Sequence, residues 1–84
     1  GLTRQLAHEL GVKGININCV CPSQTITPML KQSMNDKQIN ELSKSIPLGR
    51  LASVEDQVGP IIFLCSSLSN YLTGSIIDVN GGQL

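Results

Sequence analysis

The sequence predicts an α/β fold in which two parallel strands are joined by a helical crossover. Three features support this prediction: a strand-like run over residues 15–21, a long helical pattern over residues 53–68, and a second strand-like run over residues 75–79. Strands that are separated by a long helical connection form βαβ units, whose strands are parallel. Because parallel sheets are normally covered on both faces and contain further strands, we expect this unit to be the C-terminal part of a larger doubly wound sheet.

Length, charge and cysteine content narrow the class of protein. A chain of 84 residues supports one small domain, and a net charge of zero provides no electrostatic surface for nucleic acid or an anionic membrane. No apolar run approaches the ~18 residues of a membrane span. Three cysteines without a secretion signal indicate a reducing compartment, either the cytoplasm or an organelle matrix. The chain begins with Gly1 inside a helical pattern, which suggests a fragment of a longer protein.

The first predicted element is an amphipathic helix over residues 2–10. Leucines at every fourth position define its apolar side: Leu2, Leu6 and Leu10. Gly11 follows this pattern and is predicted to end the helix as a left-handed C-terminal cap. The single histidine, His8, falls outside the apolar stripe, so we interpret it as a solvated side chain.

A short strand is predicted over residues 15–21. Asn18 lies inside it, where its amide either bonds neighbouring loops or faces water on an edge strand. Cys19 and Cys21 point to the same face of such a strand. We interpret them as two small buried side chains. A metal-binding or redox role is the alternative, although no second pair of cysteine or histidine residues lies nearby.

The long crossover over residues 22–52 contains a predicted lid at about residues 28–46. Asn35 and Gln38 form a capping pair that starts a short helix near residues 36–45. Three apolar side chains of the lid are candidates for an adaptable wall over a small-molecule substrate: Met29, Leu30 and Met34. Simple packing beneath the lid is the alternative interpretation, and the pattern favours neither.

The long helix over residues 53–68 begins with Ser53 as its N-cap and Asp56 at the third helical position. Pro60 lies inside this helix, where it removes one backbone hydrogen bond and is expected to bend the axis. Tyr71 follows the helix and is expected to pack near its end.

Candidate binding residues lie at the carboxyl end of the first strand, the edge at which open parallel sheets bind ligands. The segment 22–27, PSQTIT, carries hydroxyls, an amide and backbone N–H groups that suit amide and phosphate groups. An ordinary strand-exit turn is equally compatible with this pattern. No catalytic constellation accompanies it, because the chain has no Ser/His/Asp set or G-x-G-x-x-G motif, and Tyr71 has no lysine four residues later.

Three stretches of the chain resemble the C-terminal third of short-chain dehydrogenases/reductases. GLTRQLAHELGVKGININCVCP resembles the stretch after that family's Tyr-x-x-x-Lys motif, and PSQTITPML resembles its PGxxxTpm loop. IPLGRLASVEDQVGPIIFLCSSLSNYLTGSIIDVNGG resembles its PlgRxxxpeEia…FLaS…s.yiTG…vDGG ending. Each stretch alone is a weak signal, but their order and spacing over the whole chain are specific.

The resemblance implies that residues 1–84 are the C-terminal part of one Rossmann-like domain in an oxidoreductase that uses NAD or NADP and acts on a carbonyl or alcohol. By position, it implies a nicotinamide-binding loop formed by Pro22, Ser23, the backbone of Thr25, and Thr27. It further implies that the lid covers the substrate, that Arg50 is structural, and that the 53–68 helix and the 75–79 strand form a homo-oligomer surface. The family's catalytic Tyr and Lys and its phosphate-binding loop have no counterpart here, so the chain alone is expected to be inactive.

Three departures from the family pattern matter for the candidate site and the chain ending. Ser23 replaces the usual Gly of the loop, Thr25 stands where Ile or Val is common, and Asn80 replaces the usual Asp of the ending. Ser23 is expected to alter the turn and to narrow the pocket near the nicotinamide. A non-catalytic binding or oligomerisation module is the alternative function, because a sheet without its neighbouring strands leaves an apolar face exposed.

Overall fold

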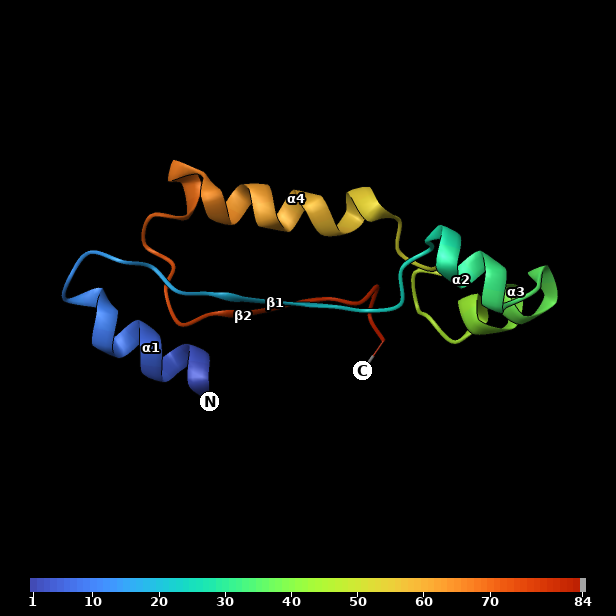
Figure 1. Ribbon diagram of the computed structural model, residues 1–84, viewed down its shortest axis with the longest axis horizontal. Helices are drawn as coiled ribbons and strands as arrows, with labels where there is room; N and C mark the ends of the chain where they lie inside the picture. The colour runs from blue at the N-terminus through green and yellow to red at the C-terminus, as the bar shows by residue number, and fades with distance from the viewer. Residues whose placement is uncertain (84) are drawn as a thin grey trace.

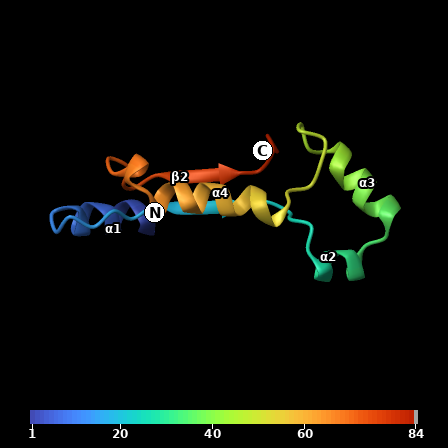
Figure 2. The ribbon, with the colours of Figure 1, turned by 90° about the horizontal axis from the view of Figure 1, so that it is seen from above.

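A two-stranded parallel sheet lies at the centre of the computed structural model, which describes residues 1–83. Along the chain, the elements are α1 (Leu2–Gly11), β1 (Cys19–Pro22), α2 (Pro28–Ser33), α3 (Asp36–Lys44), α4 (Val54–Cys65), the 3-10 turn η1 (Ser67–Ser69) and β2 (Ile76–Val79). Figure 1 shows α4 running along the strands on one side of the sheet, with α1 on the other side near the amino end of β1. Seen from above, α2 and α3 extend beyond the carboxyl end of β1 (Figure 2).

The strands pair in the parallel direction predicted for a βαβ unit. Cys19 pairs with Ile76 and Pro22 pairs with Val79. The α/β fold class and the parallel direction are therefore confirmed. Since side chains alternate along a strand, Cys19 and Cys21 lie on the face opposite to Val20.

The first strand is shorter than predicted, because it begins at Cys19 and not at residue 15. The preceding residues are tied to the segment 70–75 mainly through side chains. The N–H of Ile17 donates to Thr73 Oγ1 at 3.0 Å, and the N–H of Gly74 donates to the carbonyl of Ile17 at 2.7 Å. Bonds to side chains, such as that with Thr73, hold this segment extended without the regular backbone pairing of a strand.

Asn18 ties two loop segments together, as the sequence predicted. Its Nδ2 donates to the carbonyl of Leu72, and its Oδ1 accepts from the N–H of Ser75, both at 3.0 Å. Both ends of the partly buried amide are thus satisfied. These bonds fix the start of β2 against the start of β1.

Two sequence predictions about the ends of helices are wrong. Gly11 is still helical, and the left-handed residue is Gly14 (φ 76°), because the chain completes one further turn before it leaves α1. Tyr71 does not pack at the end of α4, since its side chain is fully exposed. Ser69 is the buried residue after α4, and its hydroxyl donates to the carbonyl of Leu64 at 2.9 Å.

The starts of the two main helices agree with their predicted caps. Asn35 and Gln38 form a reciprocal capping box at α3, and Ser53 and Asp56 form another at α4. Each box satisfies two backbone N–H groups that a helix would otherwise leave unpaired. Pro60 lies within α4, which continues to Cys65.

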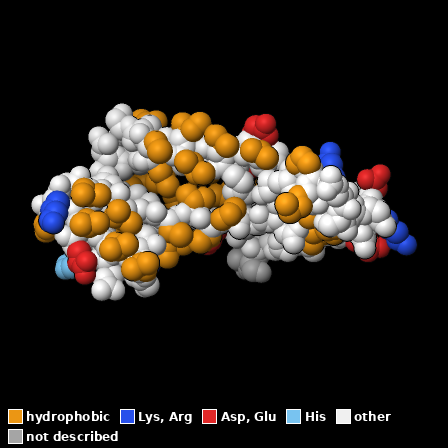
Figure 3. Space-filling model, in the orientation of Figure 1, with side chains coloured by type: hydrophobic (Ala, Val, Ile, Leu, Met, Phe, Trp, Pro, Cys, Tyr) orange, Lys and Arg blue, Asp and Glu red, His pale blue; other side chains and the backbone are white. Residues whose placement is uncertain are grey.

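Deep burial is concentrated at the root of the lid. Ile46 and Leu51, which flank the exit from α3, are 3% and 2% exposed, whereas the only other deeply buried apolar residue described is Ala7. The outer side of α4 is exposed and apolar, as Figure 3 shows: Val54, Val58, Ile61, Ile62 and Phe63. The radius of gyration is 15.9 Å, larger than the ~12 Å expected for a compact chain of this length.

Candidate nicotinamide loop

The predicted binding loop, residues 22–27, leaves the carboxyl end of β1 and runs beside the segment that leads into α4. Its start stays in register with β2, because the N–H of Ser23 donates to the carbonyl of Val79 at 3.2 Å. Its middle forms a parallel bridge between Thr25 and Ala52. The N–H of Ile26 donates to the carbonyl of Ala52 at 2.7 Å, so the loop is held on both sides of this bridge.

The side chain of Thr25 is fully engaged with the protein. Its hydroxyl donates to the carbonyl of Ser23 at 3.1 Å and accepts from Nε2 of Gln57 at 3.4 Å. The first bond closes a local turn, and the second connects the loop to α4. The hydrogen of the Thr25 hydroxyl is therefore already used within the protein.

Backbone groups of this loop remain available. Within residues 1–83, the N–H groups of Gln24 and Thr25 and the carbonyl of Thr25 have no hydrogen-bond partner. The two groups of Thr25 point away from the bridge partner Ala52, because the bonds on that side are made by Gln24 and Ile26. A donor and an acceptor on one peptide edge match a carboxamide, which carries one carbonyl and one amino group.

Thr27 combines a structural role with a free donor. It is the N-cap of α2, and its Oγ1 accepts from the N–H of Leu30 at 3.2 Å. A hydroxyl has two lone pairs and one hydrogen, so capping leaves the Thr27 hydrogen able to donate to a ligand. The loop therefore ends in a hydroxyl whose orientation the helix fixes.

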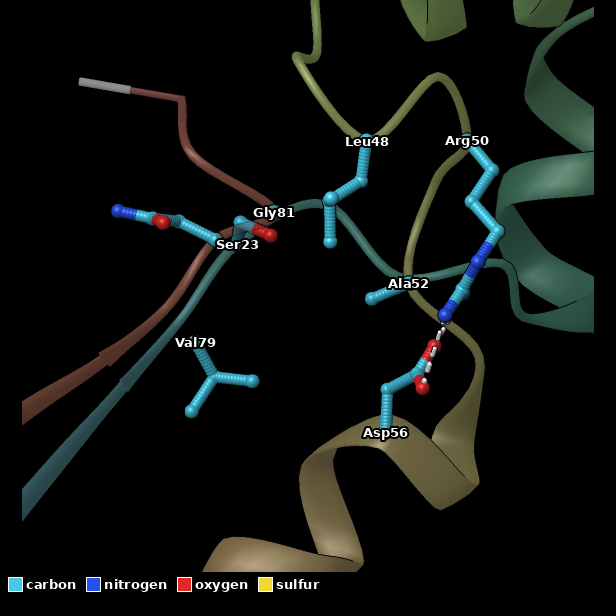
Figure 4. Close-up of a pocket in the computed structure, with 8 residues that line it drawn as sticks. Ser23, Leu48, Arg50, Ala52, Asp56, Val79 and Gly81 are labelled. Carbon is cyan, nitrogen blue, oxygen red and sulfur yellow. Dashed lines mark hydrogen bonds and ion pairs between the residues drawn. The ribbon is translucent and has the colours of Figure 1, made fainter.

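Ser23 lines a small cavity on the α4 side of the sheet, shown in Figure 4. The cavity has a volume of about 130 Å³ and is lined by Ser23, Leu48, Arg50, Ala52, Asp56, Val79, Asn80 and Gly81. Sites for drug-sized ligands and cofactors are usually some 300–1,000 Å³. This cavity is too small for a dinucleotide, and of the predicted binding residues it contains only Ser23.

Arg50 and Asp56 close one side of this cavity with a bidentate ion pair (Figure 4). Asp56 also accepts from the N–H of Ser53 at 2.8 Å as part of the capping box. The Arg50 guanidinium, followed by the bonds from Ser53, holds the pKa of the Asp56 carboxyl well below its usual range. Arg50 is thus a structural clamp on the start of α4, which agrees with the role that the resemblance implies.

The turn after β2 packs against the root of the lid. Asn80 accepts from the N–H of Gly82 through its Oδ1 at 3.0 Å, so the amide makes the turn bond that an aspartate would make. A Cβ on Gly81 (φ 61°) would lie 2.8 Å from Cγ2 of Ile46. The N–H of Leu48 donates to the carbonyl of Gly81 at 3.0 Å. These contacts connect the end of β2 to the exit from the lid.

The three lid candidates differ in exposure within residues 1–83. Met29 is 78% exposed, whereas Leu30 and Met34 are partly buried. All three belong to α2 or its C-cap, which lies beyond the end of β1 (Figure 2). The N–H of Leu30 donates to the hydroxyl of Thr27, so the lid begins directly at the binding loop.

The cysteines and histidine form no metal site in the described part of the chain. The Sγ atoms of Cys19 and Cys21 lie 3.8 Å apart, and no group of three metal-ligating side chains includes them. The hydrogen bond with Cys19 raises the pKa of the Cys21 thiol. Over residues 1–83, no helix has both the length and the apolar character required to cross a bilayer.

A family model described as enoyl-(acyl carrier protein) reductase matches residues 1–83. The chain belongs to this family. Its relatives include a protein of Sinorhizobium fredii named as an uncharacterized short-chain type dehydrogenase/reductase, which is 39% identical over 84 residues. The 3-oxoacyl-[acyl-carrier-protein] reductase FabG of Chlamydia trachomatis is 40% identical over 83 residues. The resemblance drawn from the motifs is confirmed at the level of the family.

The chain spans about a third of the length of these relatives: all or 99% of this chain matches 33% of each. A solved structure shows the same arrangement, with a TM-score of 0.88 and 26% identity over 99% of this chain and 35% of the other. That structure is titled as YwfH, an NADPH-dependent reductase involved in bacilysin biosynthesis. The fold of this enoyl-(acyl carrier protein) reductase family member is therefore part of a Rossmann-like α/β domain.

Sequence reasoning missed the connection between the loop and α4. Gln57 lies on a partly buried side of α4 and donates to Thr25. The sequence offers no clear signal, since Gln57 directly follows the charged residues Glu55 and Asp56 of the helix start. The ion pair of Arg50 with Asp56 was also missed, because six residues separate the two and no regular element contains both.

Proposed function

We propose that the protein containing this chain is an NAD(P)-dependent oxidoreductase that acts on a carbonyl or alcohol, and that this chain supplies the nicotinamide-side loop, the substrate lid and an oligomer surface. The observation that carries the proposal is the loop at residues 22–27. The hydroxyl oxygens of Thr25 and Thr27 are engaged with the protein, while backbone groups of Gln24 and Thr25 and the hydrogen of Thr27 remain available. The family match and the NADPH-dependent relative support the same cofactor class.

The donor set fits the carboxamide of a nicotinamide. The N–H of Thr25 would donate to the carboxamide oxygen, and the carbonyl of Thr25 would accept from its amino group. Thr27 would donate to the carboxamide or to the neighbouring phosphate, and Pro22 and Ser23 would set the turn that presents these groups. When bound, the nicotinamide supplies hydride transfer to or from the substrate carbon. Residues 28–46 would cover the substrate and limit access of water.

The chain does not contain the acid that such a reaction needs. Tyr71 is fully exposed, and Ser75 stands where a partner lysine would be expected. We assign no catalytic residue to residues 1–84, and we expect them to catalyse no hydride transfer alone. Residues 1–84 would form the C-terminal part of a single NAD(P)-binding domain, in a protein of a reducing compartment.

The test is cofactor binding by the intact protein, followed through the fluorescence of the reduced nicotinamide. Thr27→Val, which removes the free donor and the cap, is expected to weaken binding by about tenfold or more. Thr3→Val, on α1, is the matched control and should leave the dissociation constant unchanged. An intact protein that binds neither NADH nor NADPH would exclude the proposed function.

Ser23→Gly tests the proposed turn. Gly restores the residue usual in the family loop, so a change in cofactor affinity of either sign indicates that the Ser23 side chain shapes the nicotinamide pocket. An unchanged affinity means that the turn tolerates Ser without consequence. Turnover of carbonyl substrates by residues 1–84 alone would contradict the absence of a catalytic residue.

A second candidate function is a non-catalytic oligomerisation module, which the exposed apolar side of α4 favours. Under the main proposal, the same surface, α4 with β2, joins copies of the protein. Ile62→Glu places a charge on this surface, since Ile62 is 62% exposed. It should shift the intact protein towards monomers in sedimentation measurements under either hypothesis. Cofactor binding by the wild-type protein, with carbonyl reduction, discriminates the enzyme from the module.

A further inference from the structure

Within residues 1–83, Gln57 is the one side chain of α4 that hydrogen-bonds the candidate nicotinamide loop. Its Nε2 donates to Oγ1 of Thr25 at 3.4 Å, across 32 positions of the sequence. That distance is at the long end of the hydrogen-bond range, so this contact alone is weak. Its significance comes from where the amide lies and from what it leaves unsatisfied.

The Gln57 amide lies in a place where an apolar side chain would cost less. Its Oε1 is buried and has no hydrogen-bond partner in the described residues. Burial of an unpaired acceptor is unfavourable, so the amide is retained at a cost in stability. The other partly buried residues here are Ser53, Asp56, Pro60 and Leu64, and the side chains of Ser53 and Asp56 already accept from each other's backbone N–H groups.

The orientation of the amide is determined by the loop. The Thr25 hydroxyl already donates its hydrogen to the carbonyl of Ser23 at 3.1 Å, so it can only accept from Gln57. Gln57 must therefore direct its amino group to Thr25 and its carbonyl oxygen elsewhere. These hydrogen bonds connect α4 through Thr25 to the carbonyl of Ser23.

Two polar residues have replaced two apolar ones. In the family pattern that the chain resembles, Thr25 stands where Ile or Val is common, and Gln57 falls at the Ile of the peEia stretch. The structure brings these two departures together. The contact between loop and helix at these two positions is polar and directional.

We propose that Gln57 is a positioning residue that sets the orientation of the Thr25 peptide for the nicotinamide, and that Thr25 and Gln57 act as one unit. The inference rests on the proposed function, since it requires a cofactor at the loop. Arg50 and Asp56 fix the first turn of α4, so Gln57 holds the loop from a rigid support. A hydrogen-bonded unit of this kind favours one orientation of the loop, which an apolar contact would not.

The experiment measures the dissociation constant of reduced cofactor and the thermal midpoint of the intact protein for Gln57→Leu, Thr25→Val and the double variant. Each single variant leaves one member of the pair against an apolar group, so cofactor binding should weaken by about three- to tenfold. The double variant restores an apolar contact and should bind more tightly than either single variant. Gln5→Leu, on the exposed side of α1, is the matched control.

Gln57→Glu supplies a readout that a purely structural role would not move. The ionised carboxylate of this variant cannot donate to the Thr25 hydroxyl, whereas the protonated carboxyl can. Cofactor affinity of this variant, relative to the wild type, should therefore recover as the pH falls through the pKa of the new carboxyl. The wild-type protein and Gln5→Leu should show no such relative change.

The outcomes separate the two proposals. If the wild type binds cofactor, but all Gln57 and Thr25 variants bind within about twofold of it, the positioning role is wrong and the proposed function stands. Variants that lose thermal stability with no change in cofactor affinity lead to the same conclusion. If the wild type binds no cofactor, the proposed function fails and the positioning role fails with it.

Discussion

The root of the lid and the outer side of α4 are both rich in apolar side chains, but only the first is packed within this chain. Ile46 and Leu51 are almost completely buried, and the turn at Gly81 fits against Ile46 so closely that a Cβ would collide. On α4, Ile62 remains 62% exposed. The contacts that connect lid, loop and strand end are thus complete within residues 1–83, whereas those of the helix surface are not.

This difference distinguishes residues that pack within the chain from residues that are suited to contact a partner. The lid root determines a geometry by itself, because its bonds join Ala52, Leu48 and Gly81 to segments of the same chain. The surface of α4 has the composition of an interface but no partner in the described residues. We therefore expect substitutions at the lid root to act on folding, and substitutions on α4 to act on association.

The largest expected effect is at Leu51. Leu51→Ala removes a fully buried side chain and leaves a cavity, which should lower the free energy of unfolding by about 2–4 kcal/mol. Urea unfolding of the intact protein, at two protein concentrations, measures this effect and should give the same loss at both.

Ile62→Ala is the counterpart of this substitution on α4. If the helix surface joins copies of the protein, the loss in free energy of unfolding caused by Ile62→Ala should depend on protein concentration. Association stabilises the folded state by mass action. A concentration-independent cost as large as that of Leu51→Ala would show that the α4 surface is core packing within one subunit, and it would remove the contrast between the two regions.

A smaller effect is expected at the turn after β2. Gly81→Ala requires a positive φ that alanine adopts reluctantly, and its Cβ would lie 2.8 Å from Ile46. The loss should be about 1–3 kcal/mol. Gly11→Ala is the matched control, since Gly11 is helical with open space around it, and this change should stabilise slightly. Equal effects of the two substitutions would contradict the close packing of this turn.

The smallest expected effect is the loss of the ion pair between Arg50 and Asp56 in acid. Arg50 and the bonds from Ser53 lower the pKa of Asp56 in the folded state. The stabilisation is therefore present above the unfolded pKa of about 4 and is lost as the pH falls through the folded value. Urea midpoints between about pH 6 and about pH 2.5 should fall less steeply for Asp56→Asn than for the wild type. Parallel curves would show that the pair contributes nothing measurable, as is common for exposed pairs.

The sequence predicted those parts of the structure that local patterns determine. The capping boxes at Asn35 and Ser53 were correct because a cap and its partner lie three residues apart. The parallel pairing was correct because the helical crossover permits little else. The ties made by Asn18 followed from the rule that buried amides find partners.

The errors occurred where distant segments decide the outcome. Tyr71 is exposed because Ser69 takes the buried position after α4, and Gly11 stays helical because the turn to β1 needs its left-handed residue at Gly14. For the candidate site, the sequence predicted the loop but not which of its polar groups bond the protein and which remain free. That division depends on Ala52 and Gln57, which only folding brings to the loop.

The pairing of Cys19 with Ile76 has a consequence for the order of folding. These partners lie far apart in the sequence, so their contact closes a long loop and loses much chain entropy before any ladder bond forms. The capped helices α3 and α4 lie inside that loop and need only local contacts, so they should form first, with the strands joining late. Substitutions at Ser53 should then slow folding, while substitutions at Ile77 should mainly accelerate unfolding. Rate measurements that reversed this order would show that the strands, and not the helices between them, nucleate the fold.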